Sequence, residues 1–134
     1  AERVSDEGES DVTVIARAVG ITRPDGVEVV QVVERAVREL AVGEVRLAVR
    51  AAAVNPTDIG VRERGIEGEP PPWVPGMDAA GIVESVGDGV AHVHVGEAVM
   101  AAVSPRRPEG GAQAELVVAP AASVVPAPVP AVVA

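Results

Sequence analysis

Hydrophobic and polar residues alternate along residues 43–54, GEVRLAVRAAAV, with the two-residue period of a β-strand. A strand here places one set of side chains on a buried face, namely Val45, Leu47, Val49 and Ala51, and a second set on a wet face, namely Arg46, Ala48 and Arg50. Five further runs read as strands between Gly, Pro and Asp turns: residues 12–21, 27–34, 80–86, 92–103 and 111–119. Short strands at such spacing predict a barrel or a sandwich.

The first two of these runs predict a β-hairpin, because the intervening residues 22–26, TRPDG, have turn chemistry. A helix over residues 28–40 is an alternative, since VERAVREL places apolar residues at helical spacing. We favour a strand to about residue 34, followed by an irregular link.

A polar stretch rich in Pro and Gly, residues 55–76, interrupts the strands. Pro56, Thr57 and Asp58 suit the start of a helix, so we expect one short helical turn after Pro56. Trp73 is the only aromatic residue, and we expect it to fill the core beside this loop. The prolines of residues 123–134 predict an extended segment, either an edge strand or a polyproline-like linker.

The composition fits one folded domain with a core of small aliphatic side chains. The chain has 134 residues, a common domain size. Phe and Tyr are absent, so Val, Ala, Ile and Leu must fill the interior. Residues 1–11, AERVSDEGESD, are mostly acidic and small, and we expect a flexible acidic tail there.

Charge and missing residue types exclude several functions. The net charge of −9 makes nucleic acid and anionic membranes poor partners. All 11 basic residues are Arg and there is no Cys, which excludes a Schiff-base lysine, disulfides and thiolate chemistry. No apolar run approaches the ~20 residues of a membrane-spanning helix, and no signal peptide is visible. We therefore expect a cytoplasmic location.

Four glycines lie within residues 75–90, PGMDAAGIVESVGDGV. Gly87, Asp88 and Gly89 resemble the start of a dinucleotide-binding fingerprint, but His92 occupies its third glycine position. The residues that follow alternate like a strand, whereas the fingerprint needs a helix. A tight turn between strands is the favoured interpretation.

The spacing G-x-[DE]-x-x-G-x(5)-G that begins at Gly76 occurs with three other blocks, GEVRLAVRAAAVNPTDIG, VGEAVMA and GGAQAELVVAP. Together they resemble the N-terminal GroES-like (alcohol dehydrogenase-like) domain of medium-chain dehydrogenases/reductases, in the zinc-independent quinone oxidoreductase branch. The resemblance runs from about residue 16 to about residue 128. It implies a mainly β fold, a GroES-like partly open β-barrel with one or two short helices. We expect this catalytic domain over residues 12–128, followed by a C-terminal extension at residues 129–134.

The zinc-binding members of this family hold their catalytic metal with a Cys and a His. The matching positions here are Asn55 and Met77, and Asp78 stands where those members have a Glu beside the metal. A carboxamide and a thioether do not hold Zn²⁺. The resemblance therefore implies no zinc site.

The resemblance assigns catalytic roles to Asn55 and Thr57. In the zinc-free branch the matching Asn faces the nicotinamide and the substrate, so the Asn55 amide is a candidate donor to a developing oxyanion. The alternative, which the residues alone favour, is an Asn that ends a strand before proline. Asn55 and Pro56 are then the candidate cofactor contacts. Thr57 matches a hydroxyl that relays protons in zinc members, with a helix cap as its alternative. Asp58 is expected to tie down the loop.

Other polar residues carry weaker signals. Gly60 and Gln113 replace two tyrosines of quinone reductases, which disfavours quinone reduction specifically. His92 and His94 would share one face of a strand, where exposure to solvent is favoured over a metal pair.

A pair of arginines, Arg106 and Arg107, lies between prolines. The pair is a candidate contact for a phosphate or a protein partner. A solvated loop is the favoured interpretation.

Members of this family bind NADP(H) in a separate Rossmann-type domain, and this sequence contains no complete fingerprint or βαβ periodicity. We expect the chain to supply one wall of a cleft and to be inactive alone. The implied partners are a Rossmann-type domain or subunit and a small carbonyl or quinone-like substrate. The alternatives are a stand-alone binding or scaffolding module, one subunit of a split reductase, or an oligomeric chaperonin-type cap. Exposed sheet edges would favour self-association.

Overall fold

The computed structural model describes residues 2–4 and 12–128. Its β-strands are β1 (Glu2–Val4), β2 (Val12–Ile21), β3 (Val30–Val37), β4 (Glu44–Ala51), β5 (Asp78–Val86), β6 (Ala98–Ala102), β7 (Leu116–Pro120) and β8 (Val124–Pro126). One α-helix, α1 (Pro56–Arg64), and two 3₁₀ turns, η1 (Val27–Val29) and η2 (Ala121–Ser123), complete the described elements. The expected C-terminal extension at residues 129–134 lies outside the described residues.

The predicted hairpin is confirmed as β2 and β3, which pair antiparallel from Ile21↔Val30 to Val14↔Val37. The strand continues past residue 34 to Val37, so the irregular link begins later than expected and the helical alternative is wrong. The hydrophobic pattern of residues 33–37 fits both the helical and the strand period. Their pairing with β2 shows that the segment is a strand. Within the expected acidic tail, Glu2–Val4 differs from the prediction because it forms β1 and pairs with β2.

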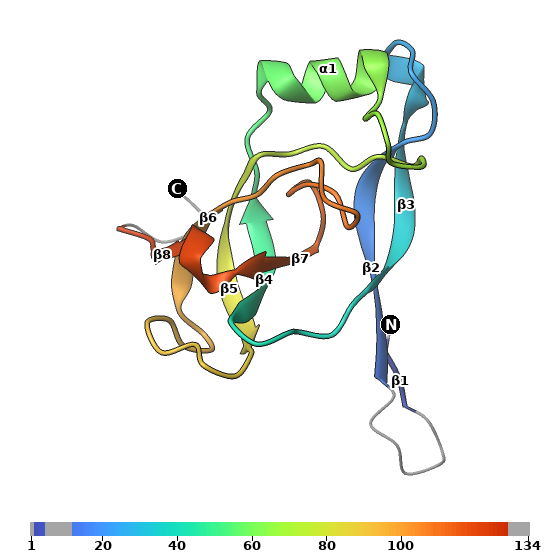
Figure 1. Ribbon diagram of the computed structural model, residues 1–134. Coiled ribbons are helices and arrows are strands. Elements are labelled where there is room, and N and C mark those ends of the chain that lie inside the picture. The colour runs from blue at the N-terminus through green and yellow to red at the C-terminus, as the bar shows by residue number, and fades with distance from the viewer. Residues whose placement is uncertain (1, 5–11, 129–134) are drawn as a thin grey trace.

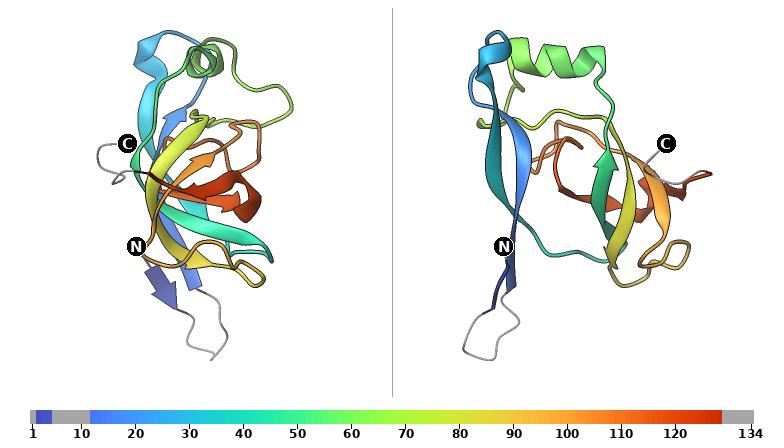
Figure 2. Two further views of the ribbon diagram at one scale, coloured as in Figure 1. Left: turned by 90° about the vertical axis from the view of Figure 1, so that its left-hand side faces the viewer. Right: turned by 180° about the vertical axis from the view of Figure 1, so that it is seen from behind.

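Two separate sheets form a partly open barrel, as the resemblance implied. The first has the order β1-β2-β3 and the second β7-β4-β5-β6-β8. Figures 1 and 2 show the hairpin on one side, the five-stranded sheet on the other, and α1 lying across one end. The segment before β7 joins the two sheets through an isolated bridge between Ala18 and Ala114.

The alternation in residues 43–54 is confirmed in β4. Val45 and Leu47 are fully buried, whereas Arg50 is exposed and Arg46 pairs with Glu84 on the outer face. The main core contains almost only Val, Ala and Leu, which is what a sequence without Phe and Tyr requires. A close approach explains one glycine: a Cβ on Gly81 would meet the carbonyl oxygen of Ala48 on the adjacent strand.

A second, smaller core lies under α1 and contains Ile21, Val29, Val61 and Ile66. Trp73 packs against this cluster and donates its indole N–H to the Glu69 carbonyl oxygen at 2.8 Å, so its predicted core role is confirmed. The helix has nine residues and is longer than the single turn expected. No helix within residues 2–4 and 12–128 is long and apolar enough to cross a membrane.

Two sequence expectations are wrong. Residues 92–95 lie in a loop before β6, so His92 and His94 do not share the face of a strand. The His92 Nε2 atom forms a hydrogen bond with the Val124 carbonyl oxygen at 2.9 Å. This side-chain contact takes the place of backbone pairing between residues 92–95 and another strand. Arg107 is half-buried and not part of a solvated loop, because backbone carbonyl groups bind its guanidinium.

The turn predicted around residues 87–89 is confirmed. Gly89 has a φ of 85°, which only glycine adopts without strain, and no helix follows it. The geometry of a dinucleotide fingerprint is therefore absent from this segment.

Candidate functional site

Asn55 lies between β4 and α1 and is the N-cap residue of the helix. Its backbone is extended, with φ −117° and ψ 163°, and Pro56 follows at a position where a missing N–H costs nothing. The Asn55 backbone N–H donates to the Asp58 carboxylate at 2.7 Å, and the Asp58 N–H donates to the Asn55 carbonyl oxygen at 2.9 Å. These two bonds fix where the Asn55 side chain emerges.

Asp58 is the one buried charged residue among those described, with 5% of its surface exposed. Its Oδ1 atom accepts the backbone N–H of Gly76 at 2.8 Å, and its Oδ2 atom lies 3.4 Å from the Gln113 side-chain amide nitrogen. The carboxylate therefore ties the start of α1 to the chain before β5 and to the segment before β7. The expectation that Asp58 holds the loop is confirmed.

Asp78, at the start of β5, orients the Asn55 amide. Its Oδ2 atom accepts a hydrogen bond from Asn55 Nδ2 at 3.3 Å, while its Oδ1 atom accepts the Ala53 N–H at 3.0 Å. An amide nitrogen has two hydrogens, so this contact leaves a second donor for a ligand. Gln113 adds a long contact to the Ala53 carbonyl oxygen at 3.5 Å.

The site is anionic. Within the described part of the chain, neither Asp58 nor Asp78 forms an ion pair, and every donor to them is a neutral amide. Amide donors stabilise a carboxylate without neutralising its charge. This network therefore favours positive charge that develops beside Asn55.

The surroundings of Asn55 are open and apolar. Val54, Ile59 and Met77 expose 75%, 46% and 40% of their surfaces. A groove of about 560 Å³ adjoins the network through Asp78, and it is lined mainly by alanines of residues 51–53, β5 and β6, together with Met100. Hydrophobic exposure of this kind around a polar group is typical of a surface that binds a ligand or a protein partner.

The other candidate residues are placed differently. Pro56 and Thr57 lie in the first turn of α1 with exposed side chains. The Thr57 hydroxyl makes no hydrogen bond to the network of Asn55, Asp58 and Asp78. The structure therefore joins Asn55 to both carboxylates and leaves Thr57 beside them on the surface.

The residues present do not fit zinc. The Asn55 amide nitrogen is directed at Asp78, and the neighbouring side chain is the thioether of Met77. No group of three or more His, Asp or Glu residues within residues 2–4 and 12–128 could hold a metal ion. Two carboxylates that already accept amide N–H groups, beside an amide and a thioether, are not a zinc-binding set.

The phosphates of a dinucleotide do not fit here either. The Asp58 carboxylate occupies the start of α1, where a phosphate would need free N–H groups, and Asp78 adds a second negative charge nearby.

The partly open barrel and the matched family model define the class of this domain. The alcohol dehydrogenase GroES-like domain model matches residues 41–129, and the chain belongs to this family. It is the GroES-like domain found in the medium-chain dehydrogenase/reductase superfamily.

Similar proteins include oxidoreductases. Over 89 residues the chain is 36% identical to the human synaptic vesicle membrane protein VAT-1 homolog-like. This match covers 66% of this chain and 21% of that protein. Over 93 residues it is 37% identical to a quinone oxidoreductase of Salmonella typhimurium, covering 67% and 28%. Over 79 residues it is 39% identical to the chloroplastic NADPH-dependent alkenal/one oxidoreductase of Arabidopsis thaliana, covering 58% and 20%.

The fold of a solved relative agrees. The crystal structure of the human VAT-1 homolog-like protein superposes with a TM-score of 0.74 at 34% identity, over 86% of this chain and 36% of that one. The chain thus spans between a fifth and about a third of the length of these relatives.

Sequence reasoning missed the connection between Asp58 and Gly76. An acidic residue three positions after Asn55 is a recognisable helix-start signal, but nothing local indicates that its second oxygen binds the Gly76 N–H, 18 positions away. The role of Gln113, whose amide reaches Ala53 and Asp58, was equally invisible in the sequence.

Proposed function

We propose that the chain is the catalytic barrel domain of an NADP(H)-dependent, zinc-independent reductase related to quinone oxidoreductases and enoyl reductases. The observation that carries this proposal is the Asn55 amide, held by Asp78 at the start of α1 where a zinc-binding set is missing. The substrate is a small carbonyl or quinone-like compound. Activity requires a Rossmann-type domain, either fused or as a separate subunit. In support of this, the Asp58 carboxylate occupies the start of α1, and no helix follows the Gly87–Gly89 turn to receive the dinucleotide phosphates.

The residues of this chain contribute in two ways. The free N–H of the Asn55 amide donates to the substrate oxygen as negative charge develops on it. A bound reduced nicotinamide supplies a hydride and is left with a positive charge. The carboxylates of Asp58 and Asp78, each one hydrogen bond from Asn55, stabilise positive charge at that place. Thr57 is the exposed candidate for proton relay.

Two relatives support the cofactor and substrate class by their names. The Arabidopsis relative is an NADPH-dependent alkenal/one oxidoreductase, and the Salmonella relative is a quinone oxidoreductase. Gly60 and Gln113, at positions where quinone reductases have tyrosines, make an alkenal or enone the better first substrate to test than a quinone.

The test is a fusion of residues 1–134 to the Rossmann-type part of the Salmonella relative, assayed by NADPH oxidation with an enone and with a benzoquinone. We expect turnover with at least one substrate. Asn55→Ala should lower kcat about 100-fold, the effect of removing one oxyanion donor. Asp88→Ala, in an exposed turn, is the matched control and should leave kcat unchanged.

Three results would contradict the proposal. The first is an Asn55→Ala fusion that turns over as fast as the parent. The second is stoichiometric zinc in the purified chain. The third is a micromolar NADPH dissociation constant for the chain alone, measured by NADPH fluorescence. A properly folded fusion with no reductase activity would favour the alternative of a stand-alone binding module.

A further inference from the structure

Arg107, in the segment between β6 and β7, has a half-buried guanidinium bound only by backbone carbonyl groups. Its Nη1 atom donates to the Val118 carbonyl oxygen at 2.6 Å, and its Nη2 and Nε atoms donate to that of Gly110 at 3.1 and 3.3 Å. Burial lowers the pKa of Arg107 from its ordinary value, although an arginine keeps its proton at neutral pH. Among the described residues it forms no ion pair, and the nearby carboxylates of Glu44 and Glu109 that act on its charge are both hydrogen-bonded to Arg38.

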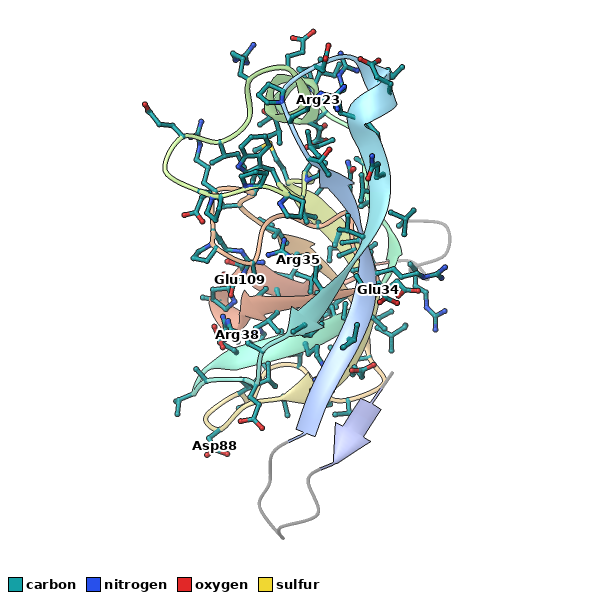
Figure 3. The ribbon with its side chains drawn as sticks, turned by 90° about the vertical axis from the view of Figure 1, so that its right-hand side faces the viewer. Arg23, Glu34, Arg35, Arg38, Asp88 and Glu109 are labelled. Carbon is teal, nitrogen blue, oxygen red and sulfur yellow. The ribbon has the colours of Figure 1, made fainter. Side chains whose placement is uncertain are left out.

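Two arginines of the hairpin face the same region. Arg35 donates to the carbonyl oxygens of Pro108 and Glu109 at 3.2 and 3.4 Å, again without a carboxylate partner in the described chain. Arg38 is satisfied, because it binds both oxygens of the Glu44 carboxylate at 2.6 and 2.7 Å and also binds the Glu109 carboxylate. Figure 3 shows Arg35, Arg38 and Glu109 gathered between β3 and the β7 side of the molecule.

The local charges do not balance. Three guanidinium groups meet two carboxylates, which leaves one positive charge in a protein whose net charge is −9. Glu34 does not cancel this charge, because alternation along β3 directs it to the opposite face from Arg35. Arg35 and Arg107 also retain unused N–H donors, since a guanidinium carries five.

A cavity of about 50 Å³ opens beside these groups. Its walls are mainly apolar, with Ala16, Ala18, Ala36, Leu116 and Val117 among them, and Arg35, Arg38, Arg107 and Glu109 also line it. Its volume corresponds to between one and two water molecules, each of which takes about 30 Å³ in the liquid. A ligand must therefore be small, with an anionic head for the guanidinium groups and at most a short apolar group.

From this cavity and its unbalanced charge we propose a binding site for a small monocarboxylate between the β2–β3 hairpin and β7. The two carboxylate oxygens match the planar donor fork of a guanidinium, and the alanine walls accept a methyl group. Arg35 and Arg107 hold the anion, while Arg38 is occupied by its own carboxylates. The proposal is independent of the reductase activity and of Asn55.

Acetate is the probe, added to the folded 134-residue chain at an ionic strength near 0.15 M and followed through the arginine Nε–H signals by NMR. We expect saturable shifts at Arg35 and Arg107. Arg35→Gln should weaken acetate binding at least tenfold. Ala16→Val should do the same, because Ala16 is buried opposite Arg35 and lines the cavity, so the larger side chain narrows it and keeps every charge. Arg106→Gln should change binding less than twofold, because the neighbouring Arg106 is exposed and its guanidinium makes no hydrogen bond within the described chain.

Sodium chloride at equal ionic strength separates specific binding from screening. Shifts that do not saturate, or that chloride reproduces, would overturn the proposal, as would Arg35→Gln or Ala16→Val chains that bind acetate like the parent. If Arg35→Gln does not fold, Ala16→Val alone decides, because its effect tests the cavity without touching the ion pairs.

Discussion

The Asp58 carboxylate supports both the fold and the candidate site, and its removal has an effect that the structure allows us to estimate. In Asp58→Ala the buried Gly76 N–H loses its acceptor, which lies at 2.8 Å in the parent. The Asn55 N–H, at 2.7 Å, loses its acceptor too. The Gln113 amide contact, at 3.4 Å, is long and contributes little.

Each lost contact has a typical free-energy cost. A buried donor without a partner costs about 1–3 kcal/mol, which applies to Gly76. A lost helix cap costs about 0.5–2 kcal/mol, which applies to Asn55, where water can partly replace the acceptor. Asp58→Ala should therefore lower the free energy of unfolding by about 2–4 kcal/mol, a large share of the 5–15 kcal/mol of an ordinary domain. Asp58→Asn keeps one acceptor oxygen and should cost about half as much.

Urea unfolding followed by circular dichroism measures these differences, and hydrogen exchange localises them. The Gly76 amide should exchange much faster in Asp58→Ala than in the parent, because that variant has no acceptor for it. Asp88→Ala is the control, since Asp88 projects from an exposed turn at the far end of the molecule (Figure 3). If Asp58→Ala proved no less stable than Asp88→Ala, the carboxylate would not hold the two segments together and our account of the site would be wrong.

Two further predictions concern the sheets. A hydrogen bond from Arg38 lowers the pKa of Glu44 to about 2, so this ion pair stabilises the fold above pH 4.5 and its contribution is lost as pH falls from there toward 2. Because the Arg38 side chain is 44% exposed, the ion pair contributes about 1 kcal/mol. In urea titrations the free energy of unfolding of Glu44→Gln should be lower than that of the parent by this amount at pH 7 and nearly equal to it near pH 2. An equal difference at both pH values would refute this. Gly81→Ala should destabilise the chain by about 1–3 kcal/mol in the same assay, because the new methyl group meets the Ala48 carbonyl oxygen. Ser85→Ala, on the same strand, is the control and should destabilise the chain by less than about 1 kcal/mol. Equal losses of stability would argue against a close approach at Gly81.

Several features of the fold follow from local patterns. The alternation in β4 predicted which side chains face the core, and Val45 and Leu47 are fully buried as a result. Turn chemistry at residues 22–26 and 87–89 predicted where the strands end. These predictions succeed because strand periodicity and turn preferences depend on neighbouring residues only.

Local patterns failed where distant partners compete. Residues 92–95 alternate like a strand, but they form a loop. The residues that pair with β8 are Val99–Ala101 of β6, further along the chain. Arg107 has the sequence surroundings of a solvated loop, but the carbonyl oxygens of Gly110 and Val118 are turned toward it and replace its water. A hydrogen bond to a distant backbone group leaves no trace in the local sequence.

The sequence by itself determined the barrel, the family and the identity of the polar residue at the candidate site, because glycine spacing, alternation and the Asn-Pro motif are written in consecutive residues. Only the tertiary structure decided that Asn55 is directed by Asp78, that Asp58 is buried between three segments, and that an unbalanced arginine pair borders a cavity. These contacts join residues far apart in the chain. Their strength depends on burial and on hydrogen-bond distances, and both exist only once the sheets have assembled.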